Sequence, residues 1–489
     1  MAERRVRAVP EPAQGPATET GLKPDAIGLA QDTVIGMATS APAGTVAATL
    51  AALAAAAAYG GGAVLLVTAI PMLVIANAYR RCNLWQANCG ASFEWVGRSI
   101  NPYLGFLTGW TMVIGYVVTT VAEVVVLAPS VLAIWGSSST NTWQGIGIDV
   151  ALVAIMLVIA VAGIRLTARV QVGMALVEYS ILIGLSIAGL VIVLAGHHPG
   201  AVHFSASWLS VSGIGGKGSL AAGLLISVYI YSGWDASVYV NEETRGRQVN
   251  PGRAVMLATF LLAIIYVLAQ MGLQGVVSPK ALQAHVTTAM IYAAQAIGGG
   301  AWAKVMALAI ALSVIGATGT GIVITSRLVY GMSTRDVLPR SLSRVSPRWN
   351  TPVLASVIAA ALIIAAITVD LEFAGLADIF SDVVGVSGLL FTIFYVMTGL
   401  AMMVYYRSRI IASVTDFLTI GLLPLASIIL LGWVFEKTIV QVPRGELYVV
   451  LCVIGSGIVV MLLERMLRRP AFFHMPRETY TPPATGHVG

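Results

Sequence analysis

The chain has 489 residues, of which 57% are hydrophobic and only 10% charged, whereas soluble domains carry about 25% charged residues. Its mean hydropathy of +0.86 and its many apolar runs of membrane-spanning length exclude a soluble globular protein. Lipid admits only helices or closed barrels, and continuous apolar runs favour helices. The net charge of +6 comes from basic residues in short loops, so no nucleic-acid partner is expected.

The hydropathy pattern predicts an all-α integral membrane protein, embedded in the lipid bilayer, with twelve transmembrane helices. Each span needs about 20 residues at a rise of about 1.5 Å per residue. In chain order we expect the spans at 26–54, 60–79, 103–134, 147–164, 172–195, 219–241, 254–276, 302–332, 353–369, 380–405, 416–435 and 446–465. The polar, proline-rich segment 1–24 is predicted to be a disordered tail, and it does not resemble a cleavable signal peptide.

Basic residues are distributed very unevenly between the two sets of loops. Of the 28 lysines and arginines, all but five fall in segments that share one side of the membrane in this topology. The exceptions are Lys217, Lys280, Lys304, Lys437 and Arg444. Because positive residues concentrate on the cytoplasmic side, we expect a multi-pass protein of the cytoplasmic membrane with both termini in the cytoplasm.

The connections between spans offer no catalytic machinery. The three cysteines and six histidines show no metal-ligand spacing, so neither a metal nor a cofactor is expected. The loops are too short for a soluble catalytic domain, and we expect that the protein is not an enzyme. The segment 277–301 has apolar residues at roughly helical spacing; a short lid helix and a solvated connector are both open.

Two spans are interrupted in similar ways. The first contains "GMATSAPAG" (36–44), and the sixth contains "YSGWD" (231–235). These breaks stand five spans apart, at equivalent places if spans 1–5 and 6–10 are repeats. Because five is odd, the repeats would have opposite orientation in the membrane. Paired Gly- or Pro-interrupted segments of this kind are typical of transporter binding sites. For either break alone, an ordinary kink in a membrane helix explains the residues equally well.

An interrupted helix exposes backbone groups that a ligand can satisfy. The amides of Gly44, Thr45 and Val46 would begin the second half of span 1 and present a positive dipole end, which suits a carboxylate. Carbonyls before each break suit an ammonium group. A substrate that carries both groups, an amino acid, would satisfy both.

Four stretches resemble one known family. They are "GWDASVYVNEETRGRQVNPGRAV" (233–255), "SRLVYGMSTRDVLPRSLSRVSPRWNTP" (326–352), "NPYLGFLTGW" (101–110) and "SAPAG" (40–44). Together they are similar to amino acid permeases of the amino acid–polyamine–organocation (APC) superfamily. The resemblance implies a 5+5 inverted repeat with broken helices 1 and 6. It also implies a transport core at 25–410, accessory helices 11 and 12 at 411–467, and a C-terminal tail at 468–489, which the loop arginines place in the cytoplasm.

The resemblance also implies which residues line the substrate site. Those expected at the substrate carboxylate are Ser40, Ala41, Ala43, Gly44 and Thr45. Those expected at its amine and side chain are Tyr229, Ser232, Gly233 and Asp235, with Tyr229 also acting as a gating ring.

Ionisable residues inside spans are candidates for ion coupling, because their burial is costly and such groups usually face a polar site. Glu178, Glu123 and Asp235 are the coupling candidates, and a neutral, hydrogen-bonded structural role is the alternative for Glu178. Many proton-coupled members of the family carry a lysine near the position of Glu178, so the usual coupling device is absent here. Asp32, close to the end of span 1, is interpreted as an interfacial group, solvated or paired with a loop arginine.

Other polar residues fit a gate or a packing role. Glu242 and Glu243 are expected to pair with arginines at the cytoplasmic end of span 6 and to close an inner gate. The segment "GATGTGIVITS" (316–326) fits hydroxyl ligands of a cation or close packing through small residues equally well.

The combined prediction is a secondary active transporter that moves an amino acid by alternating access, with a proton as the coupling ion. The main alternative is a transporter of polyamines or other organic amines, because the spans contain acids and no bases. A sensor without transport activity and a membrane-embedded enzyme are the other classes. The latter would need convergent acids and histidines at a membrane face, which the sequence does not offer.

Overall fold

The computed structural model describes residues 21–135, 142–196, 202, 204–211, 214, 217–285, 288–373, 376–441 and 443–481. In this part of the chain the structure is helical, apart from turns and one isolated parallel bridge between Ile27 and Thr244. The longer helices are α1 (Leu29–Thr39), α2 (Pro42–Ala57), α3 (Gly61–Trp85), α5 (Pro102–Val124), α7 (Thr142–Val161), α8 (Ile164–Ala195), α9 (Lys217–Ile230), α10 (Asn250–Val276), α13 (Gly300–Ser333), α14 (Val353–Phe373), α15 (Leu376–Tyr405), α17 (Leu423–Gln441) and α18 (Arg444–Arg468).

Shorter helical segments join or continue these helices. They are η1 (Ala58–Gly60), α4 (Ser92–Ser99), α6 (Leu127–Ile134), η2 (Ala206–Leu209), η4 (Trp234–Glu243), α11 (Pro279–Ala284), α12 (Ala289–Gly298), η5 (Arg340–Ser343), η6 (Arg407–Arg409), α16 (Val414–Asp416), the π-helical turn η7 (Phe417–Leu422) and η8 (Ala471–His474).

Nine helical stretches of the described residues are long and apolar enough to cross a membrane. One of them, Leu29–Trp85, contains α1, α2 and α3 together. Two further segments are not among these nine: the interrupted segment α9–η4 and the shorter apolar helix Val353–Val369. The all-helical membrane class is therefore confirmed, and the count of twelve spans stays a prediction.

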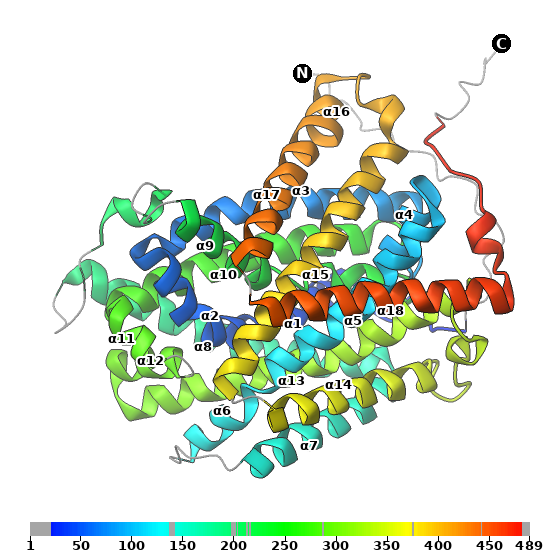
Figure 1. Cartoon of the computed structure of the whole chain (residues 1–489). Coiled ribbons are helices and arrows are strands. Elements are labelled where there is room, and N and C mark those ends of the chain that lie inside the picture. Colours follow the sequence, from blue (N-terminus) through cyan, green and yellow to red (C-terminus); the bar gives the residue numbers. More distant parts are fainter. Residues whose placement is uncertain are drawn as a thin grey trace, which may run out of the picture.

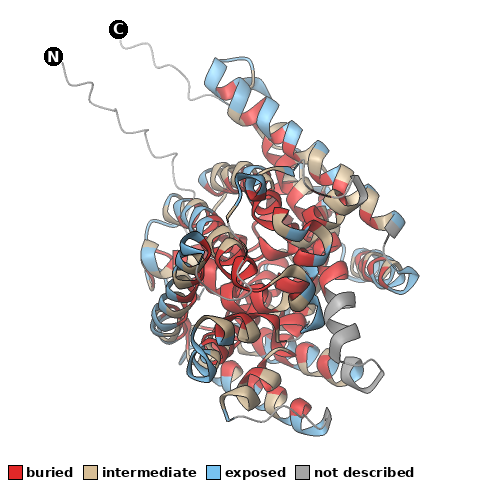
Figure 2. Cartoon of the chain, turned by 90° about the vertical axis from the view of Figure 1, so that its left-hand side faces the viewer, coloured by how far each residue is buried: buried red, intermediate tan, exposed pale blue. Residues whose placement is uncertain are grey.

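The helices pack around one large buried core. In that core, α10 packs on α3 and α8, while α13 packs on α5 and α8, and α15 packs on α5. Buried residues fill the centre of the bundle, and exposed residues lie on the outer faces of the peripheral helices (Figure 2). Large apolar side chains such as Val158 on α7 and Leu176 on α8 are exposed, which is the arrangement expected where a helix faces lipid.

Several arginine-bearing connections lie at one end of the bundle. In Figure 1, α4, the connection between α13 and α14, and the C-terminal end of α18 lie at the right. We call this end the arginine-rich face. Buried Leu22 packs near Cys89 and Tyr330, so ordered contacts begin inside the segment 1–24.

The C-terminal segment 470–481 is folded onto the arginine-rich face. The ring of Phe472 stacks on Phe93 with centroids 4.3 Å apart, and Phe473 stacks on Tyr103 at 5.1 Å. Further along, the Tyr480 amide donates to the Tyr405 carbonyl at 2.9 Å. The tail thereby covers α4 and the start of α5.

The connection between α10 and α13 lies at the opposite end of the bundle, at the left of Figure 1. Its two short helices, α11 and α12, both pack on α2. Leu282, Met290 and Ala293 are buried in this contact region. The two short helices of 277–301 therefore bury one face against the core while several of their other residues are exposed, and a lid function stays a prediction.

Candidate functional site

The first predicted break separates α1 from α2. Helix α1 ends at Thr39, and α2 begins at Pro42. Between them Ala41 has a φ of 42°. This left-handed conformation is strained for residues other than glycine. Pro42 suits the first position of a helix because it has no N–H to satisfy. The interruption expected at "SAPAG" is therefore present.

The second predicted break separates α9 from η4. Gly233 has a φ of 98°, which glycine adopts readily because it has no Cβ. A Cβ on Gly233 would lie 2.9 Å from the Thr39 carbonyl and from the Ser40 amide nitrogen. The two breaks are thus in direct contact, and both the backbone conformation and the close approach require glycine here.

The same two segments cross again one turn earlier on α1. A Cβ on Gly36 would lie 2.9 Å from the Trp234 carbonyl oxygen. Near this crossing the Ser237 hydroxyl donates to the Asp32 carbonyl at 3.0 Å. Helix α1 and η4 therefore form one packed pair.

The carbonyls at the breaks are partly satisfied by hydroxyl groups. The Ser40 carbonyl accepts from Thr45 Oγ1 at 2.8 Å and from Tyr266 OH at 3.1 Å. At the second break, Ser232 Oγ donates to the Tyr229 carbonyl at 2.7 Å. These internal bonds remove the cost of leaving backbone carbonyls unpaired in the interior.

A side chain of the protein itself binds the start of α2. Glu178 on α8 is buried, and its Oε1 accepts from the Ala43 amide at 3.0 Å. The hydroxyl of Ser313 on α13 lies beside this carboxyl. The carboxyl group observed at this helix end is that of Glu178, whereas the sequence predicted a substrate carboxylate there, which stays a prediction.

Glu123 and Tyr229 lie in the same neighbourhood. Glu123, on α5, is close enough to Glu178 and to Tyr229 for electrostatic interaction with each. Within the described residues, the buried Tyr229 hydroxyl has no hydrogen-bond partner. The structure therefore brings Glu123, Glu178 and Tyr229 together beside the first break.

Asp235 is enclosed by aromatic residues. Tyr239 OH donates to its Oδ2 and Tyr395 OH donates to its Oδ1, each at 3.0 Å. The Tyr395 ring stacks on Trp234 with centroids 5.0 Å apart, and Tyr79 meets Trp234 edge-on at 5.2 Å. Both carboxyl oxygens of Asp235 are therefore hydrogen-bonded by the protein itself.

The tyrosines around Asp235 were not predicted as site residues. Tyr239 lies four positions after Asp235 on one helical segment, so its proximity could have been found from spacing. Tyr395 and Tyr79 come from α15 and α3, and no local pattern connects them with η4. Asp149 on α7 is a further buried carboxyl outside the predicted set.

The predicted gate residues occupy the end of η4. Arg327 binds Glu243 through two bonds, Nε to Oε2 at 3.0 Å and Nη2 to Oε1 at 3.1 Å, and both side chains are fully buried. The carbonyl of Glu243 accepts from the Ala26 amide at 2.8 Å. Glu242 Oε1 accepts from the Cys89 amide at 3.1 Å. Pairing of Glu243 with an arginine is thus observed, while gating stays a prediction.

The interpretation of Asp32 as an interfacial group is wrong. Its side chain is fully buried, and Oδ2 accepts from Thr244 Oγ1 at 3.3 Å. Because η4 packs directly on α1, this turn is covered by protein instead of facing headgroups or loop arginines.

The small residues of α13 serve close packing. A Cβ on Gly321 would lie 2.2 Å from Thr120 Oγ1, and one on Gly316 would lie 2.9 Å from Gln171 Oε1. The Thr318 and Thr320 hydroxyls donate to carbonyls of their own helix. Across the described residues, no group of three or more His, Cys, Asp or Glu side chains could hold a metal ion.

Comparisons with known proteins agree with this architecture. The model of a family described as amino acid permease matches residues 29–460. The D-serine/D-alanine/glycine transporter of Escherichia coli K12 is 21% identical over 369 residues, covering 74% of this chain and 72% of that protein. The low-affinity putrescine importer PlaP of the same organism is 23% identical, covering 62% of this chain and 66% of that protein.

Solved structures share the fold. MhsT in complex with L-phenylalanine is similar with a TM-score of 0.56 and 15% identity, over 83% of this chain and 98% of that chain. A manganese transporter of Eremococcus coleocola is similar with a TM-score of 0.54 and 14% identity, over 90% and 94%. Both neighbours are LeuT-fold transporters. With the family match spanning most of the chain, this multi-pass membrane protein belongs to the amino acid permease family of the APC superfamily, a family of transporters rather than enzymes.

Proposed function

We propose that the chain is a secondary transporter that carries an amino acid or a related organic amine by alternating access. In this proposal twelve spans form a 5+5 inverted repeat, residues 25–410, with two accessory helices. The substrate binds where broken helices α1–α2 and α9–η4 meet. The observation that carries the proposal is the contact of the two breaks, with Gly233 against Thr39 and Ser40.

The relatives narrow the chemistry of the substrate. Their names give D-serine, D-alanine, glycine and putrescine as cargo. These molecules share an ammonium group and differ in whether a carboxylate is present. An ammonium group is therefore the feature that we assign to the substrate of this chain, next to the carbonyls at the breaks and the carboxyl of Asp235.

Alternating access requires contacts that form on one side and open on the other. We assign the inner gate to the end of η4, where Glu243 binds Arg327 and Glu242 binds the Cys89 amide. Tyr229 is the proposed ring over the substrate. Ser232, Gly233 and Asp235 line the second break, while Ser40, Ala41, Ala43, Gly44 and Thr45 line the first.

Coupling to a proton is part of the proposal. Glu123, Glu178 and Asp235 are buried, and within the described residues no lysine or arginine forms an ion pair with them. We call these three residues the central carboxyls. A buried carboxylate without a cation is costly, so either a proton or a cationic substrate has to neutralise this region.

The orientation follows from the basic residues. The arginine-rich face is assigned to the cytoplasm because positive loop residues stay on that side. Both termini then lie in the cytoplasm, and the protein resides in the cytoplasmic membrane.

A polyamine transporter is the second candidate function. The observation that favours it is the set of central carboxyls, since a diamine brings two positive charges to a region rich in acids. Amino acid transport is favoured by the amino acid permease family match and by the D-serine/D-alanine/glycine transporter among the relatives.

The test is uptake by the purified protein in proteoliposomes. Radiolabelled amino acids and amines are offered with and without an imposed pH gradient, and Asp235→Asn is compared with the wild type. Asp235→Asn should lower uptake by about tenfold or more, because an amide both donates and accepts and so disrupts the bonds from Tyr239 and Tyr395. Wild-type uptake by this variant at every pH would remove Asp235 from the site, and no uptake of any compound by the wild type would refute transport.

A further inference from the structure

The N-terminus of α2 is already occupied by a carboxyl group of the protein. Glu178 reaches it from α8, 135 residues along the chain, and accepts from the Ala43 amide at 3.0 Å. Both residues are buried, with 3% of Glu178 and none of Ala43 exposed. This is the position at which the breaks would otherwise offer backbone amides to a ligand.

Few amides remain at this helix start for anything else. Pro42 has no N–H, Ala43 donates to Glu178, and the Thr45 amide donates to the Ala41 carbonyl at 2.7 Å. Three of the first four residues of α2 therefore offer no free amide. A substrate carboxylate that needs two or more donors at this end would have to displace Glu178.

The surroundings of Glu178 disfavour a second anion. Ser313 on α13 is buried beside the Glu178 carboxyl, and its Oγ is 3.7 Å from the position that a Cβ on Gly44 would take. Within the described residues, Ser313 Oγ makes no hydrogen bond of ordinary geometry. Glu123 adds a second acid close to Glu178, and like charges at such range repel one another.

No cation of the described residues offsets these acids. Arg327, the fully buried arginine, is committed to Glu243 through two bonds. The central carboxyls form no ion pair with a lysine or arginine in the same part of the chain. These surroundings favour binding of an ammonium group and disfavour binding of a carboxylate.

From this geometry we propose that Glu178 occupies the carboxylate position of the site, so that the protein selects amines that lack a carboxylate. The inference rests on the proposed transport function and narrows its substrate class. Glu178 acts here as a specificity residue, because its own carboxyl group fills the position at the N-terminus of α2 that a substrate carboxylate would otherwise take. The buried Tyr229 hydroxyl, unpartnered within the described residues, lies close to Glu123 and faces the same neighbourhood.

Matched pairs of compounds test the inference in proteoliposomes that contain the full chain. Each pair differs only by the α-carboxylate: cadaverine and lysine, putrescine and ornithine, ethanolamine and serine. The wild type should prefer the member without the carboxylate by about tenfold or more in uptake or in competition. The reason is that a charge about 4–6 Å away changes the equilibrium constant of a neighbouring charged group by about 10- to 1,000-fold.

Variants at Glu178 should change that preference. Glu178→Gln removes the charge, and Glu178→Ala also frees the Ala43 amide, so both should narrow the preference, Ala more than Gln. Glu436→Gln is the matched control, because Glu436 is exposed and pairs only with its neighbour Lys437 in the described contacts. Competition on the wild type alone keeps the inference testable if a Glu178 variant fails to fold.

The outcomes separate the two proposals. Uptake of amino acids without uptake of their decarboxylated partners overturns the role of Glu178 and leaves the transport function intact. An equal preference in the wild type, or an unchanged preference in both folded Glu178 variants, also overturns it. Failure of the wild type to take up any of the amino acids and amines offered overturns the proposed function and the inference with it.

Discussion

Buried carboxyl groups occur in two regions of this molecule, and their partners differ. At the arginine-rich face, Glu243 binds Arg327 and Glu94 binds both Arg98 and Arg335. In the centre of the bundle, the partners of the central carboxyls are tyrosine hydroxyls and one backbone amide. The first region is neutralised within the protein, whereas the second is left for a proton or a cationic ligand.

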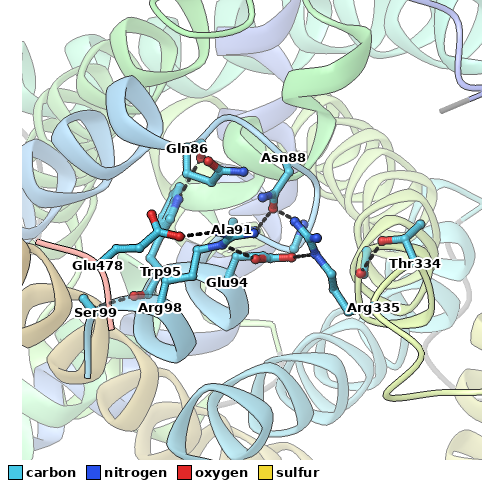
Figure 3. A network of polar contacts seen from close by, with 12 residues as sticks. Gln86, Asn88, Ala91, Glu94, Trp95, Arg98, Ser99, Thr334, Arg335 and Glu478 are labelled. Atoms are coloured by element: carbon cyan, nitrogen blue, oxygen red, sulfur yellow. Dashed lines mark hydrogen bonds and ion pairs between the residues drawn. The ribbon is translucent and has the colours of Figure 1, made fainter. Parts of the chain in front are cut away.

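Figure 3 shows the charge network at the arginine-rich face. Glu94 lies between Arg98 and Arg335, and Glu478 of the C-terminal segment approaches Arg98 from the other side. Although burial alone would lower the pKa of the Arg98 guanidinium, Glu94 and Glu478 raise it above its ordinary value. Arg98 therefore stays charged throughout the pH range in which transport would be measured.

The difference assigns separate roles to the two regions. A buried ion pair is costly to break, because removal of one partner leaves the other charge alone in the interior. Such pairs can hold one arrangement of helices firmly. A carboxyl bound only by hydroxyls or an amide can accept a proton or a cation without leaving another charge unpaired. This property fits a role in binding the substrate or the coupling ion.

Loss of Arg327 should have the largest effect on stability. Arg327→Met leaves the Glu243 carboxylate buried without a cation and should lower the free energy of unfolding by about 3–5 kcal/mol. Thermal unfolding in detergent measures the loss. The double variant Arg327→Met, Glu243→Leu removes both charges and should recover most of it, since replacing a whole buried pair by apolar residues is often nearly neutral. Equal stability of the wild type and Arg327→Met would mean that the pair does not hold this face closed.

A substitution at the second break tests the central region without touching the ion pairs. Gly233→Ala places an alanine in a left-handed conformation, which costs about 1–3 kcal/mol. Its Cβ would also lie 2.9 Å from backbone atoms of Thr39 and Ser40. Uptake should fall far more than thermal stability, because the substituted position lies in the site. Gly173→Ala on α8 is the control, since a Cβ there meets nothing within 4 Å. Normal uptake by Gly233→Ala would contradict the assignment of the site to the breaks.

The breaks and the helical class could be predicted from sequence because they depend on local composition. Apolar runs define spans, and glycine or proline inside a run marks an interruption whatever surrounds it. "SAPAG" and "YSGWD" were therefore placed correctly as the ends of α1 and α9. That they meet at one site was implied by the family resemblance rather than by the residues themselves.

The partners of the charged groups could not be predicted, because they come from distant parts of the chain. Tyr395 lies 160 residues from Asp235, and Glu178 lies 135 residues from Ala43. No spacing rule connects such positions. The buried position of Asp32 was missed for the same reason, since η4 covers it only after the two broken segments have packed together.

The smallest expected effect concerns the outer end of the charge network. The Glu478 side chain is 40% exposed, whereas the Glu94 side chain is 2% exposed. Glu478→Gln should change the free energy of unfolding by no more than about 1 kcal/mol, because solvent and salt screen an exposed pair. Glu94→Gln should cost about 3 kcal/mol or more, because it leaves Arg98 and Arg335 facing each other with no buried anion between them. Thermal unfolding of both variants at low and high salt compares them directly, and only the Glu478 effect should shrink with salt. A large, salt-independent loss of unfolding free energy in Glu478→Gln would show that Glu478 belongs to the buried network as much as Glu94 does. The C-terminal segment would then have to be counted with the region whose charges are paired within the protein.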